Sequence, residues 1–280
     1  MLLDAAYLHE KDAEWQNKKR PRKGLATVVP LYTRDDVRSV MGQFVGVDYD
    51  EVREIVPGVE ITLRNAGHIL GAAIVELELR EQGQRFRLVF SGDLGYDAAP
   101  LMQPPTQIAR ADLVVMESTY GNRNHRPFAA TIEELRSIFA SAAESGGNIL
   151  IPAFAVGRTQ DLLYLLSEHC DDFHLDRWKV YLDSPMAIEA TQLYWRNSDL
   201  QRAPLFRDRR KLAVTASEST EDSMRINAIE SGAIVIAGSG MCSGGRILHH
   251  LKHNLWRPEC HVIMIGFQAA GTLGRRLVDG

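Results

Sequence analysis

The chain has 280 residues, of which 45% are apolar and 24% charged, and its formal net charge is −4. These values are ordinary for a soluble globular protein, and the slightly acidic balance neither supports nor excludes a nucleic-acid partner. No apolar run approaches the roughly 20 residues that a membrane-spanning helix needs, and the N-terminus has no signal-peptide pattern. Three widely spaced cysteines favour a reducing cytoplasm over a disulfide framework or a C-x-x-C zinc site: Cys170, Cys242 and Cys260.

The first 57 residues are the hardest part of the sequence to interpret. Residues 4–20 are polar and lack Gly and Pro, which predicts a helix. The basic segment KKRPRKG, residues 18–24, predicts a turn or loop. That loop is either an ordinary solvated charge run or a contact for phosphates. A short helix is expected over residues 35–41, with Thr33 as its N-cap.

The pattern changes to alternating apolar and polar residues after position 58. Residues 59–67, 72–80 and 85–93 each alternate in this way, and EQGQ forms a turn between the last two. They predict an antiparallel sheet with one buried face. Residues 111–118, ADLVVMES, form a continuous apolar run and predict a strand that is buried on both faces.

Helices and strands are expected to alternate after Gly121. This order predicts a mostly parallel sheet with helices on both faces. The segment between Ser198 and Thr220 gives no clear pattern. Helices are expected over residues 128–147, 157–170, 186–197, 223–231 and 244–255 and from 271 onward, and strands over 148–154, 179–185, 233–239 and 261–267.

Three polar residues lie at strand ends in the first half of the chain. His68 stands among small residues in NAGHILGAA, Asp93 follows an apolar strand in VFSGDLG, and Glu117 ends the apolar run in LVVMESTYG. A carboxylate at the end of a buried strand is costly unless a cation or hydrogen-bond donors meet it. Taken together, the three residues predict a site for a divalent metal. Taken singly, each has a structural interpretation: a satisfied histidine, a turn aspartate and a helix cap.

The motifs around these residues resemble those of a known family. The segments A-G-H-I-L-G-A-A, F-S-G-D-L-G and E-S-T-Y-G-N-R-N-H resemble, in order, three motifs of the metallo-β-lactamase/β-CASP nucleases. Later segments resemble the β-CASP domain of the same family. These are I-P-A-F-A-V-G-R-T-Q, L-D-S-P-M-A, G-S-G-M-C-S-G-G-R and G-F-Q-A-A-G-T-L-G-R-R.

The resemblance implies an α/β fold with two domains. Residues 1–121 are expected to form a partial metallo-β-lactamase αββα sandwich, and residues 122–280 a β-CASP domain with a mostly parallel sheet flanked by helices. The family's H-x-H-x-D-H signature is absent from this sequence, and so are the later histidine motifs that would follow residue 280. The sequence is therefore expected to be truncated at both ends.

The resemblance also assigns roles to the three strand-end residues. His68 would be a zinc ligand, Asp93 would bridge two zinc ions, and Glu117 would lie either behind the metal ligands or near the nucleophile. Two zinc ions can hold a hydroxide and neutralise the charge that builds up on a phosphodiester. Catalytic zinc usually has about three protein ligands. Because only two ligands are identified, we expect this chain alone to bind zinc weakly and to have impaired hydrolase activity.

Phosphate contacts are expected at the strand-to-helix loops of the second half. The segment GSGMCSGG, with Ser239, Gly240, Ser243 and Gly244, lies between a strand and a helix and could cradle a phosphate, although a tight turn has the same pattern. Such loops gather at one edge of a parallel sheet. Further candidates, each with an ordinary surface position as the alternative, are Arg158, Ser184, Arg275, Arg276, Arg123 and His125.

The segment HHLKH places His249 and His253 one helical turn apart, a spacing that can bind metal. Since no carboxylate lies nearby in the sequence, a polar helix face is the preferred interpretation.

The resemblance implies a zinc-dependent ribonuclease that acts in RNA processing or decay, on single-stranded RNA in the cytoplasm. Exonuclease and endonuclease activity stay open, as does a homodimer. One alternative is another hydrolase of the metallo-β-lactamase fold, since one fold hosts many reactions. The other is a catalytically inactive module that binds RNA or protein.

Overall fold

The computed structural model describes residues 1–122, 124, 126–205 and 212–280. The chain has a mixed α/β fold, and it divides into two compact units, Met1–Asp48 and Tyr49–Gly280. Over the residues described, no helix is both long and apolar enough to span a membrane.

The first unit is a pair of helices joined by a loop. Thr33 caps the second helix as predicted, because its hydroxyl accepts a hydrogen bond from the Asp36 amide while the Asp36 carboxylate accepts one from the Thr33 amide. The Asn17 side chain ties the loop to the first helix through two hydrogen bonds of 2.8 Å with the Val28 backbone. The elements are α1 (Leu2–Asn17), the 3-10 helix η1 (Pro21–Lys23) in the basic segment, and α2 (Arg34–Met41).

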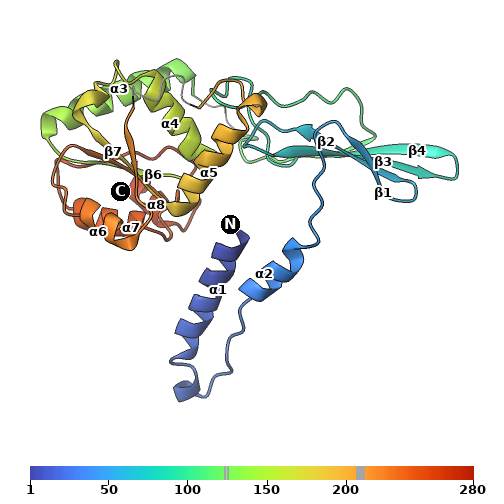
Figure 1. Ribbon diagram of the computed structural model, residues 1–280, viewed down its shortest axis with the longest axis horizontal. Helices are drawn as coiled ribbons and strands as arrows, with labels where there is room; N and C mark the ends of the chain where they lie inside the picture. Colours follow the sequence, from blue (N-terminus) through green and yellow to red (C-terminus); the bar gives the residue numbers. More distant parts are fainter. Residues whose placement is uncertain (123, 125, 206–211) are drawn as a thin grey trace. The chain divides into compact units, whose positions relative to one another are not determined.

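The second unit begins with a five-stranded sheet in the order β1-β2-β3-β4-β5 (Figure 1). Neighbouring strands are antiparallel except β4 and β5, which are parallel. This topology brings the carboxyl ends of β2, β4 and β5 to the same edge of the sheet. The sequence pattern predicted β2, β3 and β4 but missed β1. The strands are β1 (Val52–Val56), β2 (Val59–Asn65), β3 (Ala73–Glu81), β4 (Gln84–Phe90) and β5 (Leu113–Val115).

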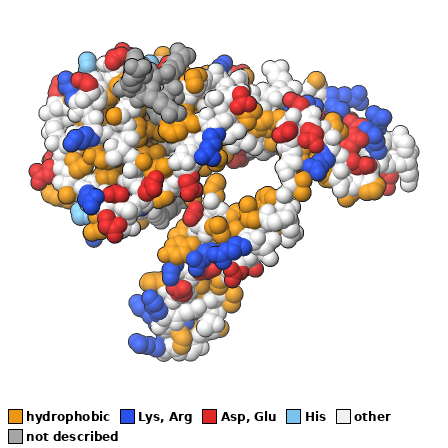
Figure 2. All heavy atoms as spheres, viewed as in Figure 1, with side chains coloured by type: hydrophobic (Ala, Val, Ile, Leu, Met, Phe, Trp, Pro, Cys, Tyr) orange, Lys and Arg blue, Asp and Glu red, His pale blue; other side chains and the backbone are white. Residues whose placement is uncertain are grey.

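The two faces of this sheet differ in chemistry. One face carries interleaved arginines and glutamates, such as Arg80 with Glu60 and Arg64 with Glu76, and Figure 2 shows these mixed charges over the strands. The apolar face is only partly buried by the described residues, and Phe86 there is 42% exposed. The prediction that residues 111–118 form a strand buried on both faces is wrong. β5 is an edge strand with one neighbour, and all three of its residues are exposed.

The second sheet is parallel throughout, as the alternation of helices and strands predicted. Its strand order is β10-β6-β9-β7-β8. β10 is shorter than the predicted strand, and β8 lies in the segment that gave no clear pattern. The strands are β6 (Ile149–Pro152), β7 (Lys179–Asp183), β8 (Val214–Ala216), β9 (Ala233–Ala237) and β10 (His261–Val262).

Helices cover both faces of the parallel sheet (Figure 1). Ile149 and Ile151 point into one core, with α3, α4 and α5, whereas Leu150 points into the other, with α6 and α7. The alternation of neighbouring side chains between the two faces explains why β6 reads as an unbroken apolar run. The helices are α3 (Phe128–Ser145), α4 (Arg158–Glu168), α5 (Pro185–Arg196), α6 (Thr220–Ile226), α7 (Ile247–Asn254) and α8 (Leu273–Asp279), with 3-10 helices η2 (Leu175–Arg177) and η3 (Ser198–Leu200).

Hydrogen bonds connect the two sheets within the second unit. The Leu70 amide, in the loop after β2, donates to the Tyr194 hydroxyl on α5 at 3.0 Å. The Arg202 guanidinium donates to the carbonyl oxygens of Asp97 at 2.7 Å and Ala99 at 3.1 Å. These contacts fix the loops at the edge of the first sheet against the helices of the parallel sheet.

Candidate active site

The loops that carry His68, Asp93 and Glu117 meet at one edge of the first sheet. These loops follow β2, β4 and β5, whose carboxyl ends share that edge. The Gly95 amide donates to the Ala66 carbonyl at 2.8 Å, which joins the second loop to the first. His68 and Asp93 are exposed, and Glu117 is half-buried.

Gly95 makes this close approach of two backbones possible. A Cβ on this residue would stand 1.9 Å from the Gly67 carbonyl oxygen and 2.9 Å from the His68 nitrogen. Only a residue without a side chain allows the loop after β4 to lie against the loop after β2 at this distance. The glycine therefore sets the separation of the His68 and Asp93 loops.

Glu117 is held in place by backbone groups. Its carboxylate accepts hydrogen bonds from the Leu94 amide at 2.9 Å and the Thr119 amide at 3.3 Å, and its own amide donates to the Ser91 hydroxyl at 3.1 Å. The Leu94 hydrogen bond is the main reason that the pKa of the Glu117 carboxyl is lowered, with further contributions from Thr119 and from the charge of His68. Glu117 is therefore an ionised side chain at neutral pH, within electrostatic range of His68.

The side chains at this edge are of the types that bind a divalent metal, but they are too few to hold one by themselves. An imidazole and carboxylates are donors that zinc accepts, and catalytic zinc usually has about three protein ligands. Among the described residues, no group of three or more His, Cys, Asp or Glu side chains is arranged to hold a metal ion. The described residues therefore do not make a complete metal site by themselves.

Arg158 lies at the start of α4, next to a glycine that packs on the loop carrying His68. It is the first residue of α4, and Gly157 before it has a φ of 83°, in the region that favours glycine. A Cβ on Gly157 would stand 2.4 Å from Cγ2 of Ile69, so the start of α4 packs directly on the loop that carries His68. Arg158 forms an ion pair with Asp161, with 3.4 Å between Nη1 and Oδ2.

The glycine-rich loop between β9 and α7 is a compact turn. The Ser239 hydroxyl accepts hydrogen bonds from the amides of Ser243 at 3.0 Å and Gly244 at 3.3 Å. Gly240 lies against Phe154, where a Cβ would stand 2.7 Å from the ring. Ser184 occupies a neighbouring position at the end of β7, where it caps α5 by accepting a hydrogen bond from the Ala187 amide. The structure therefore brings the loop residues and Ser184 to the same edge of the sheet.

The remaining predicted phosphate contacts are dispersed. Arg275 and Arg276 are exposed at the start of α8, and Arg275 pairs with Asp279 at 2.6 Å. Arg123 and His125 lie outside the described residues.

Replacing Gly245 by Ala is expected to destabilise the protein by about 1–3 kcal/mol, because a Cβ there would stand 2.4 Å from the Gly238 carbonyl oxygen and φ is 73°. Gly244→Ala is the matched control, since no described atom lies within 4 Å of its Cβ position. Thermal unfolding of the two variants checks this prediction, and equal melting temperatures would contradict it.

Sequence comparisons show which known proteins the chain resembles. Residues 159–277 match the family model described as the Beta-Casp domain. The chain is 37% identical over 256 residues to ribonuclease TTHA0252 of Thermus thermophilus. It is 31% identical over 259 residues to the transcription termination factor FttA of Methanosarcina mazei and 33% identical over 267 residues to that of Thermococcus kodakarensis.

The chain contains a Beta-Casp domain over residues 159–277. The matches cover 89% of the chain for the first two relatives and 90% for the third. This coverage agrees with the resemblance seen in the motifs. The chain spans 58% of the length of the ribonuclease and 40% of the length of each termination factor.

The Beta-Casp domain contains a buried charge network that the sequence pattern did not reveal. Asp183, at the end of β7, is fully buried and accepts hydrogen bonds of 2.6 Å from Arg246, His250 and Ser223. The network fixes the start of α7, directly after the glycine-rich loop. The one signal in the sequence was the Asp in L-D-S-P-M-A, which directly follows an apolar strand.

In the HHLKH segment, the buried histidine is not one of the two whose spacing suggested a metal site in the sequence. His249 and His253 are exposed, so the preferred interpretation as a polar helix face agrees with their position. His250, between them, is the residue that faces Asp183.

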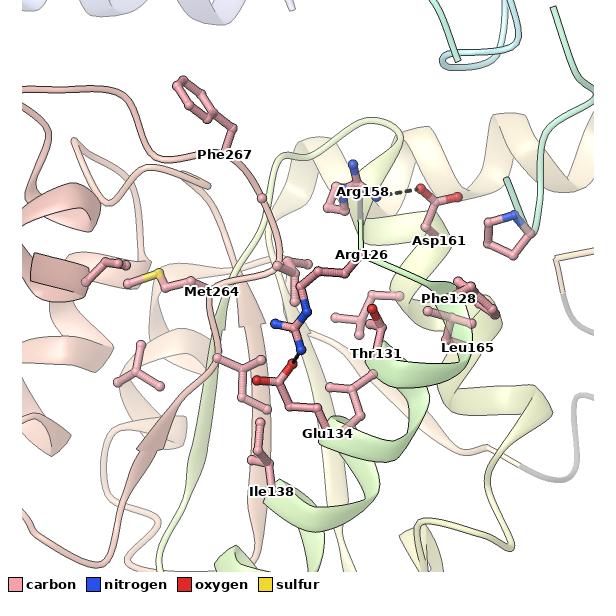
Figure 3. A pocket seen from close by; sticks show the side chains of 18 of the residues that line it. Arg126, Phe128, Thr131, Glu134, Ile138, Arg158, Asp161, Leu165, Met264 and Phe267 are labelled. Atoms are coloured by element: carbon pink, nitrogen blue, oxygen red, sulfur yellow. Dashed lines mark hydrogen bonds and ion pairs between the residues drawn. The ribbon is translucent and has the colours of Figure 1, made fainter. Parts of the chain in front are cut away.

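A cavity of about 950 Å³ lies beside the candidate site of the β-CASP chain (Figure 3). α3, α4 and the segment after β10 contribute to its walls, which are largely apolar. Two arginine–carboxylate pairs lie in its lining, Arg158 with Asp161 and Arg126 with Glu134. Arg158 and Asp161 therefore line this cavity, and Gly157, which precedes Arg158, packs on the His68 loop.

Proposed function

We propose that this chain supplies part of the active site and the phosphate-binding surface of an RNA phosphodiester hydrolase. His68, Asp93 and Glu117 are the proposed catalytic residues. The meeting of their three loops at one sheet edge, opposite the first turn of α4, is the observation that carries the proposal. A relative named as a ribonuclease supports the choice of reaction.

RNA backbone phosphates are the proposed ligands of the second sheet. The glycine-rich loop leads into the start of α7, and a helix start favours anions. Such contacts are made to phosphates and not to bases, so we propose single-stranded RNA bound with little base preference. The proposed contact residues are Arg158, Ser184, Ser239, Gly240, Ser243, Gly244, Arg275 and Arg276, together with Arg123 and His125.

The chain's own residues have distinct roles in this proposal. The ionised Glu117 carboxylate, fixed by the Leu94 amide, keeps the Asp93 loop in position and is suited to orient a water molecule or accept its proton. Arg158 carries positive charge toward the phosphodiester. The chemistry that the metal supplies is a Lewis acid and a source of hydroxide at neutral pH.

We propose zinc as that metal, with His68 and Asp93 as two of its ligands, and we propose that the 280-residue chain alone holds it weakly. Two donors are fewer than the three that a catalytic zinc usually has. For the same reason, we propose that the chain alone hydrolyses RNA poorly. An RNA-binding module without turnover is therefore the second candidate, favoured by the incomplete donor set in the described residues.

We expect the purified chain to bind RNA although it retains little zinc. After dialysis, elemental analysis is expected to find less than about one zinc ion per chain. Binding of a labelled single-stranded oligouridylate, measured by fluorescence anisotropy, is expected to persist in a chelator and to weaken with salt. Two tightly retained zinc ions per chain would contradict the donor count, and loss of binding in chelator would contradict the phosphate contacts.

Other parts of the sequence-based interpretation stay proposals. These are a domain boundary near residue 121, with a partial metallo-β-lactamase domain over 1–121 and the β-CASP domain over 122–280, a cytoplasmic location, and a homodimer.

A further inference from the structure

The first turn of α4 holds an unusual pair of charges. Arg158 occupies the first helical position, where the helix dipole disfavours a cation. Asp161 follows one turn later, where the dipole favours an anion, and its carboxylate pairs with Nη1 of Arg158 at 3.4 Å. A guanidinium has five N–H donors, so a pair through one terminal nitrogen leaves donors for a second anion.

Asp161 lies at a junction between the two sheets. The titratable and charged groups that act on it are Arg158 on its own helix, His68 from the loop after β2, Tyr96 from the segment after β4, and Tyr194 on α5. The Asp161 side chain is only 20% exposed, whereas that of Arg158 is 41% exposed. The carboxylate is thus the fixed member of the pair, and the guanidinium is the member that a ligand can reach.

We propose that Asp161 is a positioning residue that holds the Arg158 guanidinium beside the His68 loop, where Arg158 contacts a backbone phosphate of single-stranded RNA. This inference rests on the proposed function. It adds a residue that touches no substrate and acts only through Arg158.

The energetics of Asp161 argue against a purely structural role. Burial raises the pKa of the Asp161 carboxyl to about 6, although Arg158 and His68 both oppose the rise. The folded protein therefore favours the protonated form, and stability falls as the pH rises from the ordinary carboxyl pKa of 3.8 to about 6. At about pH 8 the ionised side chain costs stability, so a gain elsewhere has to explain why a carboxylate is present.

The salt dependence of RNA binding tests the proposal directly. The logarithm of the affinity for single-stranded nucleic acid falls with the logarithm of salt concentration by a slope of about 0.7 per phosphate contact. With a labelled oligouridylate as the probe, Arg158→Gln and Asp161→Asn are each expected to reduce the slope by about 0.7. The double variant is expected to match Arg158→Gln alone, because Asp161 acts through Arg158. The charge-conserving Asp161→Glu is expected to retain the slope of the unmodified chain.

A matched pair on α3 serves as the control. Glu133 and Arg136 also form an ion pair with three-residue spacing, and Glu133 is 70% exposed, so Glu133→Gln is expected to leave the slope unchanged. The melting temperature of Asp161→Asn at about pH 8 is expected to rise, which a structural role would not produce.

Several outcomes would overturn the proposal. An unchanged slope in Asp161→Asn, with equal or tighter binding, would mean that Asp161 merely repels phosphates. Additive losses in the double variant would mean that the two residues act separately. If Asp161→Asn does not fold, a reduced slope in the folded Asp161→Glu variant would also contradict the inference. Absence of salt-dependent binding by the unmodified chain would instead refute the proposed function and, with it, this inference.

Discussion

Asp183→Asn is expected to lower the free energy of unfolding by about 3–5 kcal/mol, the usual cost of removing one partner from a buried charge pair. Asp183 is fully buried, and it is the shared acceptor for Arg246, His250 and Ser223. The substitution keeps the shape of the side chain but removes the charge that balances Arg246. Urea unfolding at neutral pH measures the change.

An exposed ion pair provides the control for this variant. Asp279 pairs with Arg275 at 2.6 Å on α8, where the side chains are 55% and 46% exposed. Since such pairs contribute about 0–1 kcal/mol, Asp279→Asn is expected to change stability little. A similar small change in Asp183→Asn would show that the buried network does not stabilise the fold.

The hydrogen-bond network of Asp183 also makes the stability of the protein depend on pH, in a direction that can be worked out. Burial acts to raise the pKa of the Asp183 carboxyl, but hydrogen bonds, the largest of them from His250, outweigh burial and hold that pKa well below its usual value of 3.8. A depressed pKa in the folded state stabilises the protein above the unfolded-state value, and this contribution is lost as the pH falls below it. The difference in stability between the unmodified chain and Asp183→Asn is therefore expected to shrink below about pH 4.

Gly95→Ala is expected to separate the loops of the candidate active site. The new Cβ would stand 1.9 Å from the Gly67 carbonyl oxygen, and both partners are backbone, so one loop has to move. We expect a loss of about 1–3 kcal/mol in stability. We also expect about a hundredfold loss of any RNA hydrolysis observed with added zinc, because a displacement of about 1 Å between catalytic groups has effects of that size.

RNA binding distinguishes this effect from general unfolding. The proposed phosphate contacts lie on the parallel sheet, so Gly95→Ala is expected to bind the labelled oligouridylate with the salt dependence of the unmodified chain. Gly46→Ala is the control substitution, since its Cβ position has no described atom within 4 Å. Stability and hydrolysis equal to those of Gly46→Ala would contradict a role for Gly95 in setting the loop separation.

Local signals predicted most of the elements. The Thr33 cap, the alternation in β2, β3 and β4 and the helix–strand order of the parallel sheet are properties of short segments, and the structure contains them all. The burial of β5 was mispredicted because an apolar run does not reveal whether other elements pack against the two faces of a strand. β1 and β8 were missed because their pairing partners, and not their own patterns, define them.

The amino-acid sequence by itself determined the fold class, the resemblance to β-CASP proteins and the strand-end positions of His68, Asp93 and Glu117, because periodicity and motif order are local properties of the chain. Tertiary structure alone decided which distant residues meet. Asp183 gains its partners from α6 and α7, and Asp161 lies near His68 only because α4 packs on the loop after β2. Such contacts join segments that are far apart in sequence, and their energies depend on burial and geometry that no local pattern encodes.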